Sequence, residues 1–213
     1  MKIKDKIKEQ FLIVKDMIGH RPSRVELFTY MDDTVYENIK SKVMNPFANY
    51  LEYIKENDTL TLEEEELYNT RAREFINMIE TTSMSKTYKM PILLAFYNDG
   101  NIKMKITEDD IYKSFYEFYR KGSNKVDMLK DKSTSDFMNW DKKKYITLAK
   151  NNPVKFLLKT HGDFFKVNEG SIISLQDDLK QFIDNEAFKK HIKDAIDLRV
   201  ETYYKNRFFN KEK

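Results

Sequence analysis

Residues 164–175, FFKVNEGSIISL, are the stretch that decides the predicted fold class. Two short runs of aromatic and β-branched residues flank the turn NEG, whose glycine suits a tight reversal of the chain. This pattern predicts a β-hairpin. A further strand is expected at 101–106, NIKMKI, where polar and apolar residues alternate with a period of two. Because most of the remaining chain has helical periodicity, these short strands indicate a mainly α protein.

Helical patterns surround the predicted strands in a definite order. Residues 86–98 form an apolar helix, Thr107 caps the next helix, and residues 142–150 form a third helix that is expected to stop before Pro153. The following VKFLLK fits either a helix or a strand. Helix, strand, helix, an irregular linker over residues 122–140, helix, hairpin and helix follow one another, which is the order of a winged helix. We therefore predict a helical bundle with a winged-helix-like part that carries one short strand and a β-hairpin.

The chain is expected to divide into two regions. Residues 1–80 form an N-terminal helical, helix-turn-helix-like region, and residues 81–213 form the winged-helix-like region with C-terminal helices. The first region begins with an amphipathic helix that ends at Gly19. Three short helices follow, and a capping box of Thr61 and Glu64 starts the next helix, which is expected over residues 61–80. Ser23 is expected to cap the first short helix, Asp33 or Thr34 the second, and Pro46 lies in the first turn of the third.

Composition excludes several classes of protein. The 213 residues contain no cysteine, which rules out disulfides, thiolate catalysis, cysteine zinc sites and iron–sulfur clusters, and favours an intracellular location. No signal peptide is visible, and no apolar run approaches the roughly 18 residues that a membrane span needs. We therefore expect a soluble, cytoplasmic protein without membrane partners. Charged residues make up 34% of the chain and glycine contributes five residues, which suits a charge-coated helical protein.

Positive charge is concentrated in one segment. The formal net charge is only +3, but residues 121–166 hold eleven Lys against five Asp, an excess of six. The rest of the chain is therefore net negative. Within this segment DKKK, residues 141–144, stands at a helix start, where backbone amides attract anions and lysine opposes the helix dipole. Such a helix start suits a phosphate group. The predicted nucleic-acid-binding residues are Lys142, Lys143, Lys144, Lys155, Lys159 and Lys166.

These lysines predict contacts to the nucleic-acid backbone rather than to base edges, and hence salt-dependent binding without sequence preference. Trp140 and Phe137 precede the same helix, and either can stack on a base or pack in the core. The competing interpretation is that the segment is simply a solvated, lysine-rich surface.

Catalytic motifs are not evident in the sequence. Lys86-Thr87 precedes an apolar run, but no glycine occurs between residues 20 and 99, whereas a phosphate-binding loop requires glycines. Ser83 or Ser85 is instead expected to cap the helix, with Lys86 and Lys89 solvated or touching phosphate. The three histidines lack the spacing of an H-E-x-x-H metal site, and His161 beside Asp163 is more typical of a turn. We predict neither an enzyme nor a cofactor or metal.

Several stretches together resemble a protein family. MSKTYKMPILLAFYNDG followed by ITEDDIYKSFYEFY is similar to the far C-terminal region of large bacterial DEAD/DEAH-box helicases. GHRPSRVELFTY with NPFANYLEYI, and later NPVKFLLKTHGDFF and HIKDAIDLRVETYYKNRF, also fit these proteins. The likeness covers roughly residues 15–207. It implies an accessory region without the ATPase lobes, because no phosphate loop or D-E-x-[DH] box is present to receive the motor's catalytic residues.

The preferred hypothesis is therefore a non-catalytic nucleic-acid-binding accessory domain of a DEAD/DEAH-box helicase, with DNA as the favoured partner and the helicase motor lobes as a second partner. The parent protein would be an ATP-dependent helicase. The alternative is a protein-interaction module that docks on the helicase lobes or on a partner subunit, with antiphage defence as one context. Its surface would include Tyr112, Tyr116 and Tyr119. An uncharacterised hydrolase is the third hypothesis.

Overall fold

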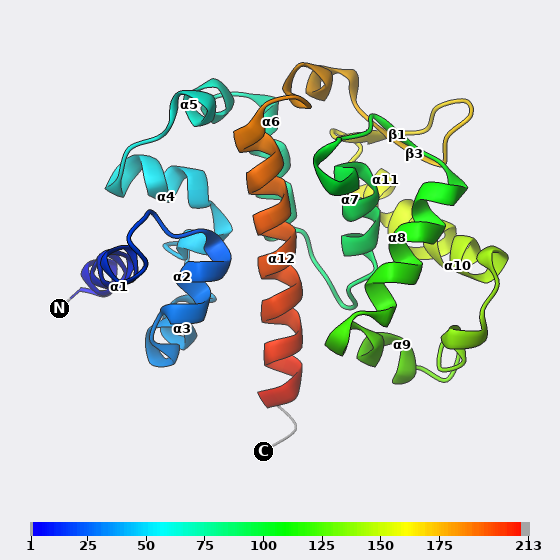
Figure 1. Ribbon diagram of the computed structural model, residues 1–213, viewed down its shortest axis with the longest axis horizontal. Helices are drawn as coiled ribbons and strands as arrows, with labels where there is room; N and C mark the ends of the chain where they lie inside the picture. The colour runs from blue at the N-terminus through cyan, green and yellow to red at the C-terminus, as the bar shows by residue number, and fades with distance from the viewer. Residues whose placement is uncertain (1, 210–213) are drawn as a thin grey trace. The chain divides into compact units, whose positions relative to one another are not determined.

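A computed structural model describes residues 2–209 of the chain, which divides into two compact units (Figure 1). The first unit comprises Met1–Thr82 and Glu186–Glu201, and the second comprises Ser83–Asn185 and Thr202–Lys213. The division falls within one long helix, α12 (Glu186–Phe209). The sequence-based division near residue 80 assigned all of this helix to the second region, whereas its larger part belongs to the first unit.

The first unit is entirely helical among its described residues. Its remaining elements are α1 (Ile3–Ile18), α2 (Arg24–Tyr30), α3 (Asp33–Ile39), η1 (Pro46–Ala48), α4 (Tyr50–Asn57), α5 (Leu62–Tyr68) and α6 (Arg71–Thr81). Figure 1 shows α12 beside α2 and α6, and its Phe188 ring lies 6.0 Å from that of Phe75 in α6. The core therefore joins helices from both ends of the chain.

Local sequence explains most of these helix boundaries. Gly19 ends α1 with φ of 79°, a left-handed conformation that glycine adopts without steric cost. Ser23 caps α2, and Thr61 forms the expected capping box with Glu64. Two expectations were wrong. Asp32, not Asp33 or Thr34, caps α3, and the helix predicted over 61–80 is two helices, because Thr70 caps a new helix after α5.

The second unit combines helices with a small antiparallel sheet. Its elements are α7 (Lys89–Tyr97), η2 (Asn98–Gly100), β1 (Lys105–Ile106), α8 (Glu108–Arg120), η3 (Gly122–Lys125), α9 (Val126–Leu129), η4 (Phe137–Asn139), α10 (Lys142–Ala149), η5 (Lys150–Val154), α11 (Lys155–Thr160), β2 (Phe165–Lys166), β3 (Ile173–Leu175) and η6 (Asp177–Phe182). The predicted mainly α fold with a short strand and a β-hairpin is confirmed.

The sheet has the strand order β1-β3-β2. Lys105 pairs with Ser174 of β3, and Phe165 of β2 pairs with Leu175. Gly170 turns the hairpin with φ of 75°. Strand β1 is shorter than the six residues predicted, because the amide of Lys103 donates to the carbonyl of Phe96 and so bonds back to α7 instead of to the sheet (2.9 Å).

Apolar side chains of α7, α8 and β3 form the core of the second unit. Phe115 in α8 and Ile173 in β3 are fully buried, and the hydroxyl of Ser114 donates to the carbonyl of Pro91 to tie α8 to α7 (2.6 Å). The linker predicted as irregular, residues 122–140, contains short helical turns around buried Met128. No helix within residues 2–209 has both the length and the apolar character that crossing a membrane requires.

Candidate nucleic-acid interface

The lysine-rich segment of the second unit is one continuous helical stretch, α10–η5–α11. Its inner side carries buried residues such as Tyr145, Ala149 and Leu157, which pack toward α7 and α8. Its outer side carries lysines. Between Lys142 and Thr160 the sequence contains six Lys and no Asp or Glu. The stretch is therefore amphipathic, and its solvent side is positively charged.

Pro153 does not end this helix, contrary to the prediction. In a regular α-helix a proline ring clashes with the carbonyl four residues earlier and removes one hydrogen bond. Here η5 is a π-helical turn with Pro153 inside it, and the wider turn accommodates the ring. The ambiguous VKFLLK consequently continues as α11 instead of forming a strand.

Three of the six predicted lysines are engaged by carboxylates. Lys142 pairs with Asp109 at the start of α8, Lys144 with Asp136 at 3.6 Å, and Lys166 with Asp177 at 2.6 Å. The hydrogen bond that Lys142 donates to Asp109 raises the pKa of Lys142, and the one that Asp177 accepts from Lys166 lowers the pKa of Asp177. Part of the charge of these lysines is therefore already compensated within the unit.

The other three predicted lysines are exposed, and their ammonium groups form no ion pair or hydrogen bond with any described residue. They lie at intervals of four along the helix together with two uncharged polar residues, which are also exposed. We call this set the lysine stripe: Lys143, Thr147, Asn151, Lys155 and Lys159.

A side-chain carboxylate of the chain itself caps the start of α10. The carboxylate of Asp141 accepts a hydrogen bond from the amide of Lys144 at 2.9 Å and caps the helix. This cap offsets the unfavourable placement of lysines near the positive end of the dipole. The helix start therefore gives no separate indication of a phosphate site. Anion binding is indicated instead by Lys143, Lys155 and Lys159, whose ammonium groups have no partner among the described residues.

Aromatic residues near α10 have divided roles. Phe137 is fully buried, whereas Trp140 is half-buried and its indole N–H donates to Asp136 at 2.8 Å. The ring centroids of Tyr112 and Tyr116 lie 5.7 Å apart, and both side chains remain partly exposed. Tyr119 is fully buried, so the exposed aromatic surface predicted from these three tyrosines is reduced to two.

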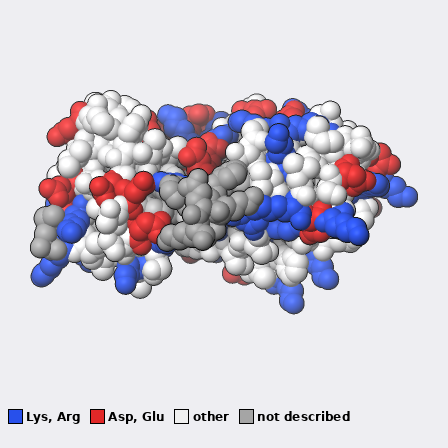
Figure 2. Space-filling model, turned by 90° about the horizontal axis from the view of Figure 1, so that it is seen from below, with Lys and Arg blue, Asp and Glu red and all other residues white. Residues whose placement is uncertain are grey.

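Charges of both signs cover the face seen from below in Figure 2. On the right of that view, which shows the second unit, lysine and arginine side chains lie close to aspartate and glutamate. Binding of an anionic partner would therefore depend on lysines that lack an internal carboxylate.

The SKTYK segment, residues 85–89, is structural. Thr87 is fully buried, and its hydroxyl donates to the carboxylate of Asp127 at 2.8 Å. Neither Ser83 nor Ser85 caps α7, which begins after Tyr88 without a side-chain cap. Lys86 pairs with Asp131 at 2.8 Å, and the ammonium of Lys89 donates to the carbonyl of Ser83, so both lysines have partners within the unit.

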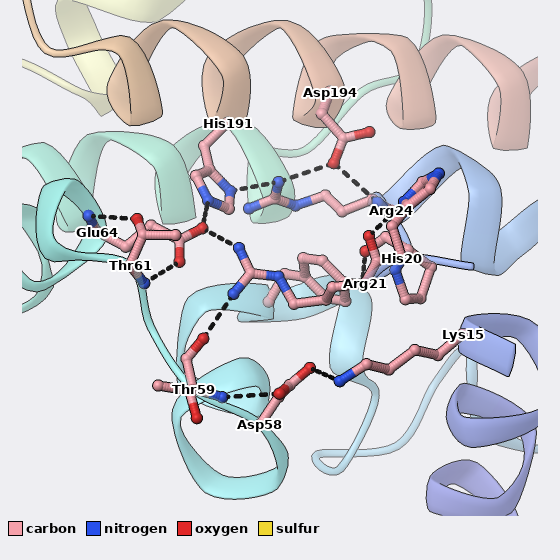
Figure 3. A network of polar contacts seen from close by, with 12 residues as sticks. Lys15, His20, Arg21, Arg24, Asp58, Thr59, Thr61, Glu64, His191 and Asp194 are labelled. Carbon is pink, nitrogen blue, oxygen red and sulfur yellow. Dashed lines mark hydrogen bonds and ion pairs between the residues drawn. The ribbon is translucent and has the colours of Figure 1, made fainter. Parts of the chain in front are cut away.

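A buried polar network in the first unit was not visible in the sequence (Figure 3). Arg24 of α2 is fully buried; its Nε donates to Glu80 at 3.0 Å, and its Nη1 donates to Asp194 at 3.0 Å and to Nδ1 of His191 at 2.9 Å. The Nη2 of Arg24 has no partner among the described residues. Glu64 lies on the other side of His191, 2.7 Å from its Nε2.

The contacts of His191 fix its protonation state. A guanidinium can only donate hydrogen bonds, so Nδ1 must accept from Arg24 and the proton must lie on Nε2, which donates to Glu64. Burial lowers the pKa of His191, and the charge of Arg24 acts in the same direction. Burial opposes ionisation of Glu64, but hydrogen bonds from His191 and from the Thr61 amide outweigh it and lower the pKa of Glu64 to about 2.

Apart from Nη2 of Arg24, the polar atoms of these buried and half-buried side chains bond to one another, so the network joins α2, α5, α6 and α12 of the first unit. The capping-box signal placed Glu64 at the start of α5, but nothing local indicated that His191, 127 positions later, would meet it. Among residues 2–209, no group of three or more His, Cys, Asp and Glu is arranged to hold a metal ion. We found no protein family whose model matches the sequence, and no curated protein or solved structure that matches it.

Proposed function

We propose that the second unit binds duplex nucleic acid through the lysine stripe. The observation that carries this proposal is the helical stretch α10–η5–α11, which contains no acidic residue and holds Lys143, Lys155 and Lys159 exposed without internal partners. Lysines in this state release counterions when they meet phosphates, which is the main electrostatic source of nucleic-acid affinity. The role would be binding rather than catalysis.

The topology of the second unit supports the proposal. Helix α7, strand β1, helix α8, the helical stretch α10–η5–α11 and the hairpin β2–β3 follow one another, and the strand order is β1-β3-β2. We interpret this order as that of a winged helix, in which the last helix before the hairpin commonly faces DNA. That helix carries the lysine stripe in this chain. The fold-level likeness raises the expectation of binding without establishing it.

Neutralising the stripe tests the proposal. In a Lys143→Gln, Lys155→Gln, Lys159→Gln variant, we expect weaker binding to a fluorescein-labelled DNA duplex. The slope of log affinity against log salt should lose up to about 0.9 for each phosphate contact removed. Fluorescence anisotropy at several salt concentrations measures both quantities. Binding by the unaltered chain that the triple variant retains in full would contradict the role of the stripe.

Two matched triple variants serve as controls. Lys121, Lys130 and Lys132 are exposed lysines of the same unit, and their replacement by Gln removes the same net charge elsewhere. An equal loss of affinity in that variant would indicate a general charge effect. The paired lysines Lys142, Lys144 and Lys166 form the second control, and we expect their replacement to weaken binding less than replacement of the stripe.

The helicase context and the cytoplasmic location are also proposals. They rest on the resemblance of motifs such as residues 84–100 and 152–165 to the C-terminal regions of DEAD/DEAH-box helicases, and on the absence of cysteine. The neighbouring coding sequence tests the context. A two-lobed ATPase motor in the same reading frame or operon would support an accessory role, and a neighbourhood without any motor would count against it.

A second candidate function, protein interaction, is favoured by a different observation. In α1 the side chains of Leu12, Ile13 and Met17 are 44%, 52% and 56% exposed, which is unusual for large apolar residues on one helix. A photo-crosslinking residue at position 13 tests this function in cells of the source organism. One reproducible crosslinked partner would support it, and a ladder of unrelated products would argue against it.

A further inference from the structure

The middle of the lysine stripe carries uncharged polar residues, which can contact bases rather than phosphates. Resting on the proposed function above, we propose that Asn151 contacts base edges in the major groove of B-form DNA, with Thr147 beside it, so that binding depends on sequence. The lysines alone predict binding without sequence preference. Asn151 would therefore be a residue that determines specificity.

The order of side chains along the stripe matches the cross-section of a major groove. Lys143 stands at one end, Lys155 and Lys159 at the other, and Thr147 and Asn151 lie between them. From Lys143 to Lys159 the helix rises roughly 24 Å, at about 1.5 Å per residue. The major groove is roughly 12 Å wide and admits a helix. A helix lying across it directs its centre toward the bases and its ends toward the two phosphate backbones.

The π-helical turn limits how far this order winds around the helix. In an unbroken α-helix, residues four apart drift by about 40° per step, so Lys143 and Lys159 would diverge by about 160°. The turn η5 packs more residues into one revolution and reduces this drift. The turn, with Pro153 inside it, thus brings Lys155 and Lys159 closer to the side of Lys143 than an unbroken α-helix would.

Asn151 has the chemistry that base contacts require. Its side chain is exposed and forms no hydrogen bond with the described residues, so its amide N–H₂ and carbonyl are both available. One planar amide can donate to N7 and accept from N6 of adenine in the major groove. Thr147 already donates its hydroxyl proton to the carbonyl of Lys143 at 2.9 Å, which leaves its lone pairs and its methyl group to contact bases.

The same geometry discriminates between DNA and RNA. The major groove of A-form RNA is deep and too narrow for side chains to reach the bases. A helix that places Asn151 against base edges is therefore compatible with B-form DNA and not with an RNA duplex. This distinction does not follow from the lysines, which contact phosphates of either polymer.

Selection from a pool of randomised DNA duplexes, followed by anisotropy titrations, tests the inference. We expect the unaltered chain to enrich an adenine-containing motif. The Asn151→Ala variant should lose about 5- to 150-fold of the preference for the selected duplex over a scrambled one, the range that a bidentate base contact supplies. Affinity for the scrambled duplex and the salt slope should not change. Asn152→Ala removes the same group from the next residue and should leave the preference intact.

The outcomes separate this inference from the proposed function. Failure of the unaltered chain to bind any duplex overturns both. Binding without enrichment of a motif, or with equal affinity for an RNA duplex of the same sequence, overturns only the inference. So does an Asn151→Ala variant that keeps the preference. Asn151→Asp keeps the size of the side chain but removes its donor, and it should also lose the preference. Two different substitutions at position 151 therefore guard against a folding defect in either one.

Discussion

Removing Arg24 should destabilise the first unit strongly, because the guanidinium neutralises a carboxylate that water does not reach. The side chain of Glu80 is 2% exposed and would retain only the Tyr50 amide as a donor in an Arg24→Met variant. Asp194 would suffer less, since it also accepts from the backbone amides of residues 24 and 25. Breaking a buried ion pair from one side costs about 3–5 kcal/mol of unfolding free energy, a large fraction of the total for most domains.

A second substitution shows whether the stranded carboxylate causes this loss. In Arg24→Met, Glu80→Met the buried charge is gone and the amide of Tyr50 is left unpaired, which costs about 1–3 kcal/mol, while Nδ1 of His191 loses its donor in both variants alike. The double variant should therefore be more stable than the single one. Urea unfolding followed by far-ultraviolet circular dichroism measures both. Fluorescence of Trp140, the single tryptophan of the sequence, reports the second unit separately.

An exposed pair provides the matched control. Arg71 and Glu74 form an ion pair on α6 with side chains 34% and 53% exposed, and Arg71→Met should cost no more than about 1 kcal/mol. The reasoning would be refuted by an Arg24→Met variant that loses less than 1 kcal/mol. A double variant as unstable as the single one would also refute it, because the loss would then not come from the charge of Glu80.

Two further predictions concern buried polar groups. Burial lowers the pKa of His191 below 6.5, so the unfolded chain binds this proton more readily than the folded one. The free energy of unfolding should therefore fall as the pH drops below about 6.5 and be retained above it. Urea titrations at several pH values measure this fall, which should be smaller for His191→Gln. Thr87→Val removes a hydroxyl that contacts Asp127 and the hydroxyls of Tyr119 and Tyr204. It should lower the unfolding free energy of the second unit by about 1–3 kcal/mol, and Thr87→Ser should lower it less. Unfolding followed by Trp140 fluorescence measures both variants.

Local signals predicted much of the fold. Alternation and turn residues identified the hairpin, and Ser23, Thr61 and Thr107 marked helix starts because their hydroxyls accept backbone hydrogen bonds close in sequence. The errors also have local causes. Pro153 normally stops a helix, and the π-helical turn that admits it depends on packing that no short window of sequence contains.

The candidate interface was only partly predictable. Clustering of lysines along the sequence is visible, but pairing with Asp109, Asp136 and Asp177 depends on tertiary structure. Asn151 lay outside the prediction, since its place in the stripe follows only when the helix continues through η5. The Arg24 network was equally hidden, because its members are separated by as many as 170 positions.

The split composition of the first unit also constrains how the protein emerges from the ribosome. Arg24 and Glu80 are synthesised early, but His191 and Asp194 follow only after residues 83–185 have been made. At about 5–20 residues per second, this delay is on the order of 5–20 s. During that time the apolar side of α6 has no α12 to cover it, while the hairpin unit can complete most of its own core. The nascent N-terminal helices should therefore be a preferred binding site for chaperones until translation passes α12.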